Sequence, residues 1–322
     1  MKRVLRRLAW AAFVMWATVS VAFLVNNALP SDPARMVAGQ QAPPAAVEKI
    51  RKQLGLDQPL RVQYVLFLRR LVHLGPSSIA GPSDPEHGSC ANLGALHVDL
   101  GRSYQQQRPV TTILAERAPR TLLLAFTAAI VQALIGVTAG VIAAVKKRKT
   151  ADRVAVGLSL LGVSAPTFVI GLLLQWVFAF KLRLFPIDGY GNTTAEHAAS
   201  LVLPAVTLGV FGAAYYTRIV RDEMIGELSH DYVRTARAKG LGKAAVVVRH
   251  ALRNATMPIV TIFGLEVGTL VGGAIITESV FRWPGIGSVI MGCVVVTSAV
   301  VVLSTLAVDL AYVILDPRVR RG

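Results

Sequence analysis

The residues of this sequence that could do chemistry are few, and they form no familiar catalytic pattern. The six histidines are scattered along the chain, and no Ser/His/Asp, HExxH or CxxC constellation occurs. No GxxxxGK followed by Ser or Thr is present, so we expect the chain not to bind ATP by itself. The sequence therefore argues against an enzyme, and it predicts neither a metal site nor a bound cofactor.

Two carboxylates, Glu266 and Asp309, fall inside apolar runs. A charge at the middle of a membrane span costs about 2.5–3.5 kcal/mol on insertion scales, so such residues usually face the protein interior and often mark function. Asp309 is near the end of its run, where we expect it to pair with a loop arginine or a backbone amide. Glu266 is deeper, and two interpretations stay open: it lines a passage, or it pairs with a partner subunit.

Small residues and prolines mark where the apolar runs can approach closely or bend. Gly264, Gly268 and Gly272 recur every four residues, which predicts either packing within the chain or a seam with a second subunit. Pro166 interrupts a run and is the best candidate for a functional bend. Three further prolines are close to the predicted starts of spans, at Pro119, Pro204 and Pro258.

A short basic segment with small side chains lies in a polar loop between two apolar runs. It predicts a two-turn helix that ends at Gly240, because a helix commonly stops at a glycine of positive φ. A rigid helix of this kind suits docking on a soluble partner. The residues that we assign to it are Tyr232, Val233, Arg234, Thr235, Ala236, Ala238, Lys239, Gly240 and Leu241.

These segments must be positioned by a membrane scaffold, since 53% of the 322 residues are hydrophobic and only 16% are charged. Each apolar run is long enough to cross about 30 Å of hydrocarbon as a helix. The first run is longer than the apolar part of a cleaved signal, and we interpret it as a signal anchor within residues 1–29. The six runs are 8–29, 121–145, 154–180, 201–217, 257–276 and 289–315.

The net charge of +16 is unevenly distributed, and this predicts the topology. Of the 34 lysines and arginines, 20 lie in the two termini and in the 146–153 and 218–253 loops. Such an excess in short loops favours the cytoplasmic side, so we expect both termini inside the cell. The basic surplus is then explained by topology and anionic lipid, and not by nucleic-acid binding.

Residues 30–108 form a predicted external segment. Prolines and glycines delimit two helices, over 45–54 and 60–74, and they predict an irregular loop between Gly75 and Gly94. Cys90 in this segment and Cys293 in the last run fall at different depths, so no disulfide is implied. The remaining boundaries are a five-helix unit over 109–315 and a cytoplasmic tail over 316–322.

Taken together, these motifs resemble the permease subunits of ATP-binding-cassette importers, in the dipeptide and oligopeptide branch. In that family a cytoplasmic coupling helix carries Glu-Ala-Ala, three residues, then Gly. Here Arg234-Thr235-Ala236 and Gly240 match the spacing, with arginine in place of the acidic residue. Segments that match the branch in order are Pro30-Ser31-Asp32-Pro33, Leu54-Gly55-Leu56-Asp57-Gln58-Pro59, Asp99-Leu100-Gly101-Arg102-Ser103, Pro119-Arg120-Thr121-Leu122-Leu123, Ser164-Ala165-Pro166-Thr167-Phe168, Arg249-His250-Ala251-Leu252-Arg253-Asn254, Trp283-Pro284-Gly285-Ile286-Gly287 and Leu315-Asp316-Pro317-Arg318.

The resemblance implies an all-α membrane protein with six transmembrane helices in the type I ABC importer permease fold. It also implies a second permease subunit, cytoplasmic ATP-binding subunits that hold ATP and Mg, and an external solute-binding protein. The transported solute would be a short peptide or a related compound. Two alternatives stay open from the residues alone: an ion-coupled secondary transporter and a membrane assembly factor that transports nothing.

Overall fold

The computed structural model describes residues 108–288 continuously, together with parts of the chain before them. The earlier described residues are 9–10, 12–17, 19–20, 23–24, 33–39, 41–53, 55–71, 73–74, 90–93, 96–100, 103 and 106. The chain divides into two compact units, of which the first includes Met1–Pro119 and the second Arg120–Ser288. Asp309, Cys293, the sixth apolar run and the tail lie outside the described residues.

Besides helical fragments within residues 9–24, the described part of the first unit contains the helices α2 (Pro33–Ala38), α3 (Pro44–Gln53) and α4 (Leu60–Leu71). The two helices expected over 45–54 and 60–74 are therefore confirmed. Gly55, at φ +67°, follows α3 in the left-handed conformation that commonly ends a helix. The second helix ends three residues early, because the chain enters a strand at His73.

A small antiparallel sheet follows α4, in the strand order β1-β3-β2. Its strands are β1 (His73–Leu74), β2 (Cys90–Leu93) and β3 (Leu96–Asp99). The expectation of an all-α fold is wrong here: the chain is mostly helical, with a hairpin where we expected an irregular loop to reach Gly94. The pairing of Leu93 with Leu96 leaves two residues between the strands, the first a glycine, which is a short-hairpin signal that the nearby prolines masked.

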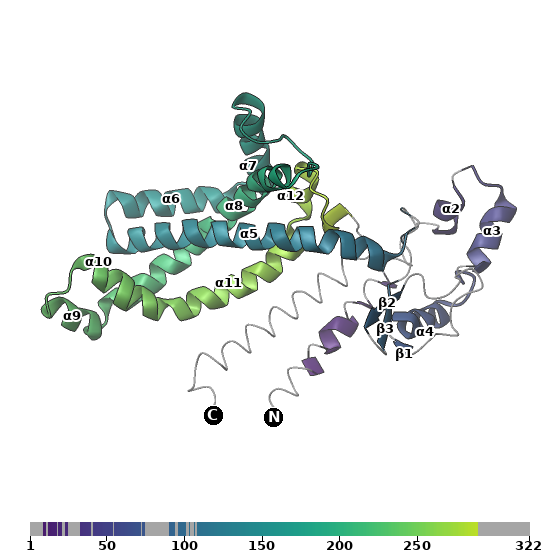
Figure 1. Ribbon diagram of the computed structural model, residues 1–322. Coiled ribbons are helices and arrows are strands. Elements are labelled where there is room, and N and C mark those ends of the chain that lie inside the picture. Colours follow the sequence, from purple (N-terminus) through teal and green to yellow (C-terminus); the bar gives the residue numbers. More distant parts are fainter. Residues whose placement is uncertain are drawn as a thin grey trace. The chain divides into compact units, whose positions relative to one another are not determined.

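The regular secondary structure described in the second unit is all helical (Figure 1). α5 (Val110–Val145) enters this unit, and a tight turn leads from it to α6 (Thr150–Ser164). α7 (Thr167–Leu174) follows, and it continues as a π-helical segment over Gln175–Lys181. The remaining elements are α8 (Thr194–Ser229), α9 (Asp231–Ala238), α10 (Lys243–Ala245), a π-helical segment over Val246–Leu252, α11 (Arg253–Gly273), α12 (Ile275–Val280) and a 3-10 turn over Ile286–Ser288.

Three helical stretches of the described chain are long and apolar enough to span a membrane: α5, α8 and Lys243–Val271. The α6–α7 pair would make a fourth, but it is bent by 104°. The bend at Pro166 agrees with the sequence expectation. Ala165 is extended at φ −81° and ψ 128°, as the residue before a proline prefers. The first predicted span is described only in fragments.

The helices extend beyond the apolar runs, and this changes the place of three prolines. Pro119, Pro204 and Pro258 lie inside α5, α8 and α11, and not at helix starts. α8, for example, begins at Thr194 because Thr193 and Glu196 form a reciprocal capping box ahead of the apolar run. Hydropathy marks the buried stretch of such a helix and misses its polar ends.

The core of the second unit is formed where α5, α8 and α11 meet. Small residues allow this close packing, as at Gly136, where an added Cβ would lie 2.6 Å from the Cβ of Tyr216. The Tyr216 hydroxyl donates to the Ile259 carbonyl at 2.6 Å, which links α8 to α11 inside the core. This packing gives α8 a fixed course toward the short helix that follows it.

Candidate functional site

The candidate site is α9, which follows α8 after the single residue His230 (Figure 1). Val233 and Ala236 are buried, and they pack against Val246 together with Leu228. Because these two residues are three apart, they share one face of the helix. α9 is therefore held by apolar contacts within its own chain.

Ala236 therefore lies on the buried face of α9, whereas its small side chain suggested a surface that a partner could approach. It is 6% exposed and faces the chain's own Val246, so it is not on the free surface of α9. An arginine at this position would disrupt the packing of α9 before it met any partner. The small residues of α9 that are exposed are Thr235 and Ala238.

The end of α9 has the geometry that the sequence predicted. Gly240 has φ +80°, its N–H donates to the Arg237 carbonyl at 3.0 Å, and the Leu241 N–H donates to the Ala236 carbonyl at 3.3 Å. These two bonds make a Schellman motif, which satisfies carbonyls that the helix end would otherwise leave free. An added Cβ at Gly240 would meet nothing within 4 Å, so the requirement for glycine here is conformational and not one of space inside the chain.

The opposite face of α9 is polar and exposed. Its cations are Arg234, Arg237 and Lys239, and Leu241 beyond the glycine is 42% exposed. Arg234 and Asp231 approach to 3.3 Å, but both side chains are largely in solvent, so the pair adds little stability. α9 thus presents a short, positively charged surface on a fixed backbone.

Tyr232 connects α9 back to α8. Its hydroxyl donates to Glu227 Oε2. The pKa of the tyrosine is raised above its usual value, mainly because the side chain is partly buried and also because of this hydrogen bond. The phenol therefore remains protonated at neutral pH and keeps its role as a donor. This bond and the apolar contacts together fix the direction in which α9 leaves α8.

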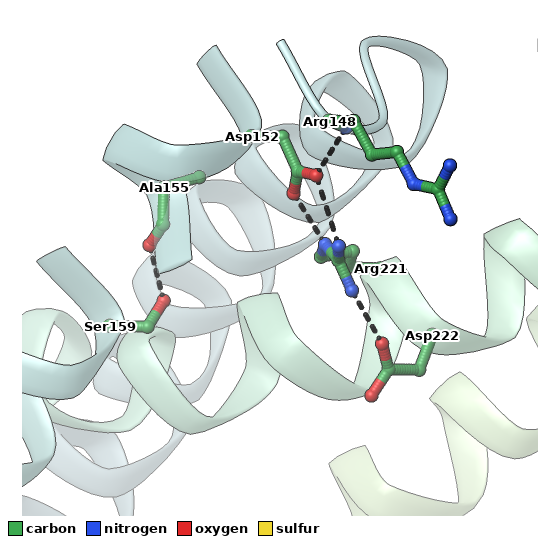
Figure 2. Close-up of polar contacts among 6 residues, drawn as sticks. All are labelled: Arg148, Asp152, Ala155, Ser159, Arg221 and Asp222. Carbon is green, nitrogen blue, oxygen red and sulfur yellow. Dashed lines mark hydrogen bonds and ion pairs between the residues drawn. The ribbon is translucent and has the colours of Figure 1, made fainter. Parts of the chain in front are cut away.

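An ion pair braces α8 nearer its middle (Figure 2). Arg221 of α8 donates to both carboxylate oxygens of Asp152, at 2.5 Å from Nε and 3.0 Å from Nη2. Asp152 is 4% exposed and also accepts from the Arg148 N–H at 2.7 Å. The turn between α5 and α6 is thereby fixed to the helix that carries α9.

The other predicted residues are not gathered around α9. Glu266 lies half-buried in α11 and accepts a hydrogen bond from Thr269 Oγ1 at 3.3 Å. On the same helix Gly268 is buried and Gly264 half-buried within this single chain, as packing inside the chain would require. A seam with a second subunit along Gly264, Gly268 and Gly272, and a place for Pro166 beside the pathway or that seam, stay predictions.

Glu278 is the most deeply buried carboxylate among the described residues, and no sequence expectation included it. It is 2% exposed and accepts from Thr121 Oγ1 at 2.6 Å and from the Gly287 N–H at 2.7 Å. The hydroxyl of Thr121 in turn accepts from the Ile286 N–H at 2.9 Å. The only signal was a lone acid directly after the fifth apolar run, and its partner on α5 is 157 positions away.

Comparison with known proteins gives matches along most of the sequence. The profile of "Binding-protein-dependent transport system inner membrane component" matches residues 136–321, and that of the corresponding N-terminal region matches residues 1–125. A glutathione transport system permease protein, GsiC, of Salmonella paratyphi A is 36% identical over 329 residues, with 98% of each chain covered. A probable D,D-dipeptide transport system permease protein, DdpB, of Escherichia coli K12 is 35% identical over 356 residues, with 99% of this chain and 98% of the relative covered.

A solved structure gives an independent comparison of the fold. The inward-facing MetNI methionine ABC transporter matches 65% of this chain and 98% of its own, with a TM-score of 0.54 and 19% identity. At this identity the likeness concerns the fold alone.

Proposed function

Since this chain belongs to the family of binding-protein-dependent transport system inner membrane components, we propose that it forms half of a translocation pathway for short peptides or peptide-like solutes. It is a membrane-spanning permease subunit of an ATP-driven importer, and not an enzyme. The family thereby sets aside the ion-coupled transporter and the assembly factor. The names of the two relatives, a glutathione and a D,D-dipeptide permease, support small peptides as the solute class.

The observation that carries the coupling part of this proposal is the structure of α9. A helix that is buried on one face by Val233 and Ala236, and exposed and cationic on the other, can transmit force from a partner to its own chain. We assign the partner as a cytoplasmic ATP-binding subunit. ATP-driven closure of two such subunits would then move α9 and tilt α8.

The remaining partners follow from the same assignment. A second permease subunit would complete the pathway, and an external binding protein would deliver the solute. ATP and Mg would bind to the ATP-binding subunits and not to this chain. In this topology both termini and α9 are cytoplasmic, and residues 30–118 are external.

Gly240→Val in the assembled transporter tests the coupling assignment. A non-glycine residue in the left-handed region costs about 1–3 kcal/mol, and valine resists it more than most residues because of its branched Cβ. We expect solute uptake in proteoliposomes to fall at least fivefold, with ATP hydrolysis no longer stimulated by the solute-loaded binding protein.

Gly240→Asn is the matched control, because asparagine adopts positive φ with little strain and the site has room for it. Uptake by this variant should stay within twofold of the wild type. Ala238→Arg, on the exposed face, should reduce uptake without loosening α9, whereas Ala238→Ser should not. Wild-type uptake by both Gly240→Val and Ala238→Arg, with the ATP-binding subunits attached, would show that α9 is not the coupling element.

A further inference from the structure

The turn between α5 and α6 carries four consecutive cations: Lys146, Lys147, Arg148 and Lys149. All four are exposed, and Arg153 in the first turns of α6 is exposed as well. A cationic cluster at the C-terminus of α5 is favourable for that helix, but four adjacent charges repel one another. A cluster this dense is therefore suited to an anionic partner.

The nearest buried carboxylate is already neutralised from inside the chain. Arg221 engages both oxygens of Asp152, and the backbone N–H of Arg148 donates to the same carboxylate. Figure 2 shows the guanidinium of Arg148 directed away from Asp152. The charge of Asp152 thus stabilises the turn and leaves the side chains of the cations available.

The turn is also fixed in conformation. Arg148 adopts φ +66°, and backbone bonds run from the Lys146 N–H to the Ile142 carbonyl at 3.0 Å and from the Lys149 N–H to the Lys146 carbonyl at 2.9 Å. Ordering the backbone before binding lowers the entropy lost when a ligand arrives. The four cations are therefore held on a preformed turn.

Exposed apolar side chains flank the cations on both helices. Val145 and Ile142 on α5 are 49% and 45% exposed, and Val154 and Leu158 on α6 are 52% and 63% exposed. Apolar side chains that face outward with cations at their edge are the pattern of a helix leaving the hydrocarbon layer. If α5 crosses the bilayer, this pattern places the turn at the depth of the lipid headgroups. The inference rests on the proposed function at this one point, the crossing of the bilayer by α5.

We propose that the 146–149 turn binds the phosphate groups of anionic phospholipids. The partner is a lipid and not an acidic protein, because the adjoining exposed surface is apolar on both helices and suits acyl chains directly below the headgroups. Each cation near an anionic membrane surface contributes about 1 kcal/mol, so removing two of them should weaken the association about thirtyfold.

The test uses the complete transporter in nanodiscs, with phosphatidylglycerol or phosphatidylcholine that carries a photoreactive headgroup. Mass spectrometry locates the cross-links along the chain. We expect phosphatidylglycerol to label residues near the turn at least tenfold more than phosphatidylcholine, and 1 M NaCl to abolish the difference, since the screening length then falls to about 3 Å.

The variant Lys147→Gln with Arg148→Asn should reduce this labelling by at least tenfold. Its matched control is Lys181→Gln with Arg183→Asn. This pair also removes one lysine and one arginine, and Arg183, like Arg148, has a positive φ after an apolar helix. The control should leave labelling near 146–149 unchanged. Equal labelling by both lipids, or no effect of the first variant, would overturn the proposal. If the first variant does not accumulate, the lipid and salt comparisons on the wild-type complex decide alone.

A protein partner at the turn would give a different result. The first variant would then lose an associated subunit on purification, with lipid labelling unchanged, and that outcome also refutes lipid binding. Loss of coupling in Gly240→Val has no bearing on this assay, so the two proposals can fail separately.

Discussion

At the α12 end of the Arg120–Ser288 unit a buried carboxylate binds several partners, whereas the buried contacts of α9 are apolar. Glu278 accepts directional bonds from Thr121 and Gly287, and the Trp283 indole N–H donates to the Arg120 carbonyl at 3.2 Å. Such bonds permit one geometry, because a small displacement weakens them steeply. Contacts such as that of Val233 with its neighbours are non-directional and tolerate small shifts.

The two ends of this helical unit are therefore held in different ways. The α12 end is held by directional bonds between residues far apart in the sequence, and α9 is held by apolar contacts and one hydrogen bond to nearby parts of the chain. A partner that moves the α9 end would act against a fixed opposite end. Three substitutions test this difference, and they are given in order of decreasing expected effect.

Glu278→Ala should have the largest effect on stability. It removes the acceptor of the Gly287 N–H and the Thr121 hydroxyl in a buried site, which should cost about 4 kcal/mol. Thermal unfolding followed by tryptophan fluorescence should show a clear fall in midpoint. Glu266→Ala, which removes a half-buried glutamate of α11, should cost about 1 kcal/mol or less, and equal effects of the two would refute the special role of Glu278.

Gly287→Ala should be the next most damaging. Its Cβ would lie 2.7 Å from Glu278 Oε2 and 2.8 Å from the Cα of Ile275, and backbone cannot move aside, so we expect a loss of about 3 kcal/mol. Gly226→Ala on α8 is the control from the other end, since nothing lies within 4 Å of its added Cβ. Gly226→Ala should be neutral or stabilise the protein by up to about 1 kcal/mol. If Gly226→Ala and Gly287→Ala lowered the stability equally, packing at Glu278 would not be the cause.

Val233→Ala should have the smallest and most local effect. Losing two buried methyl groups costs about 2 kcal/mol, which should speed amide hydrogen exchange in α9 about thirtyfold. Exchange in α12 should not change. Thr235→Ala on the exposed face should alter amide hydrogen exchange little. If Val233→Ala accelerated exchange equally along the whole unit, α9 would not be held independently of α12.

The sequence was sufficient where structure depends on local signals. The helix end at Gly240 and the break at Pro166 were both predicted, because a positive φ and a missing amide are properties of one residue and its neighbours. The inward direction of Ala236 was missed. Ala236 is three residues from Val233, and this spacing indicates that both lie on the same face of the helix. Val246, which covers both residues, could not be identified from spacing.

Features that depend on distant partners were beyond sequence reasoning. Glu278 gave no signal of burial, since Thr121 and Gly287 become its partners only when α5 and the segment after α12 meet. The bend of 104° between α6 and α7 was equally inaccessible, because a proline fixes where a helix breaks and the packing of α7 on α8 fixes the direction. The paired strands were hidden by the prolines around them.

The length of α8 has a mechanical consequence. Its 36 residues make a rod of about 54 Å, which is about 24 Å longer than the hydrocarbon layer, and only His230 separates it from α9. A rod of this length would act as a lever arm, with the contact between Tyr216 and α11 as its pivot. This contact lies about 33 Å from Thr194 and about 20 Å from Ser229. A displacement of a few ångströms at Ser229 would therefore turn α8 about this contact and press its longer arm against the fixed end of the unit near α12.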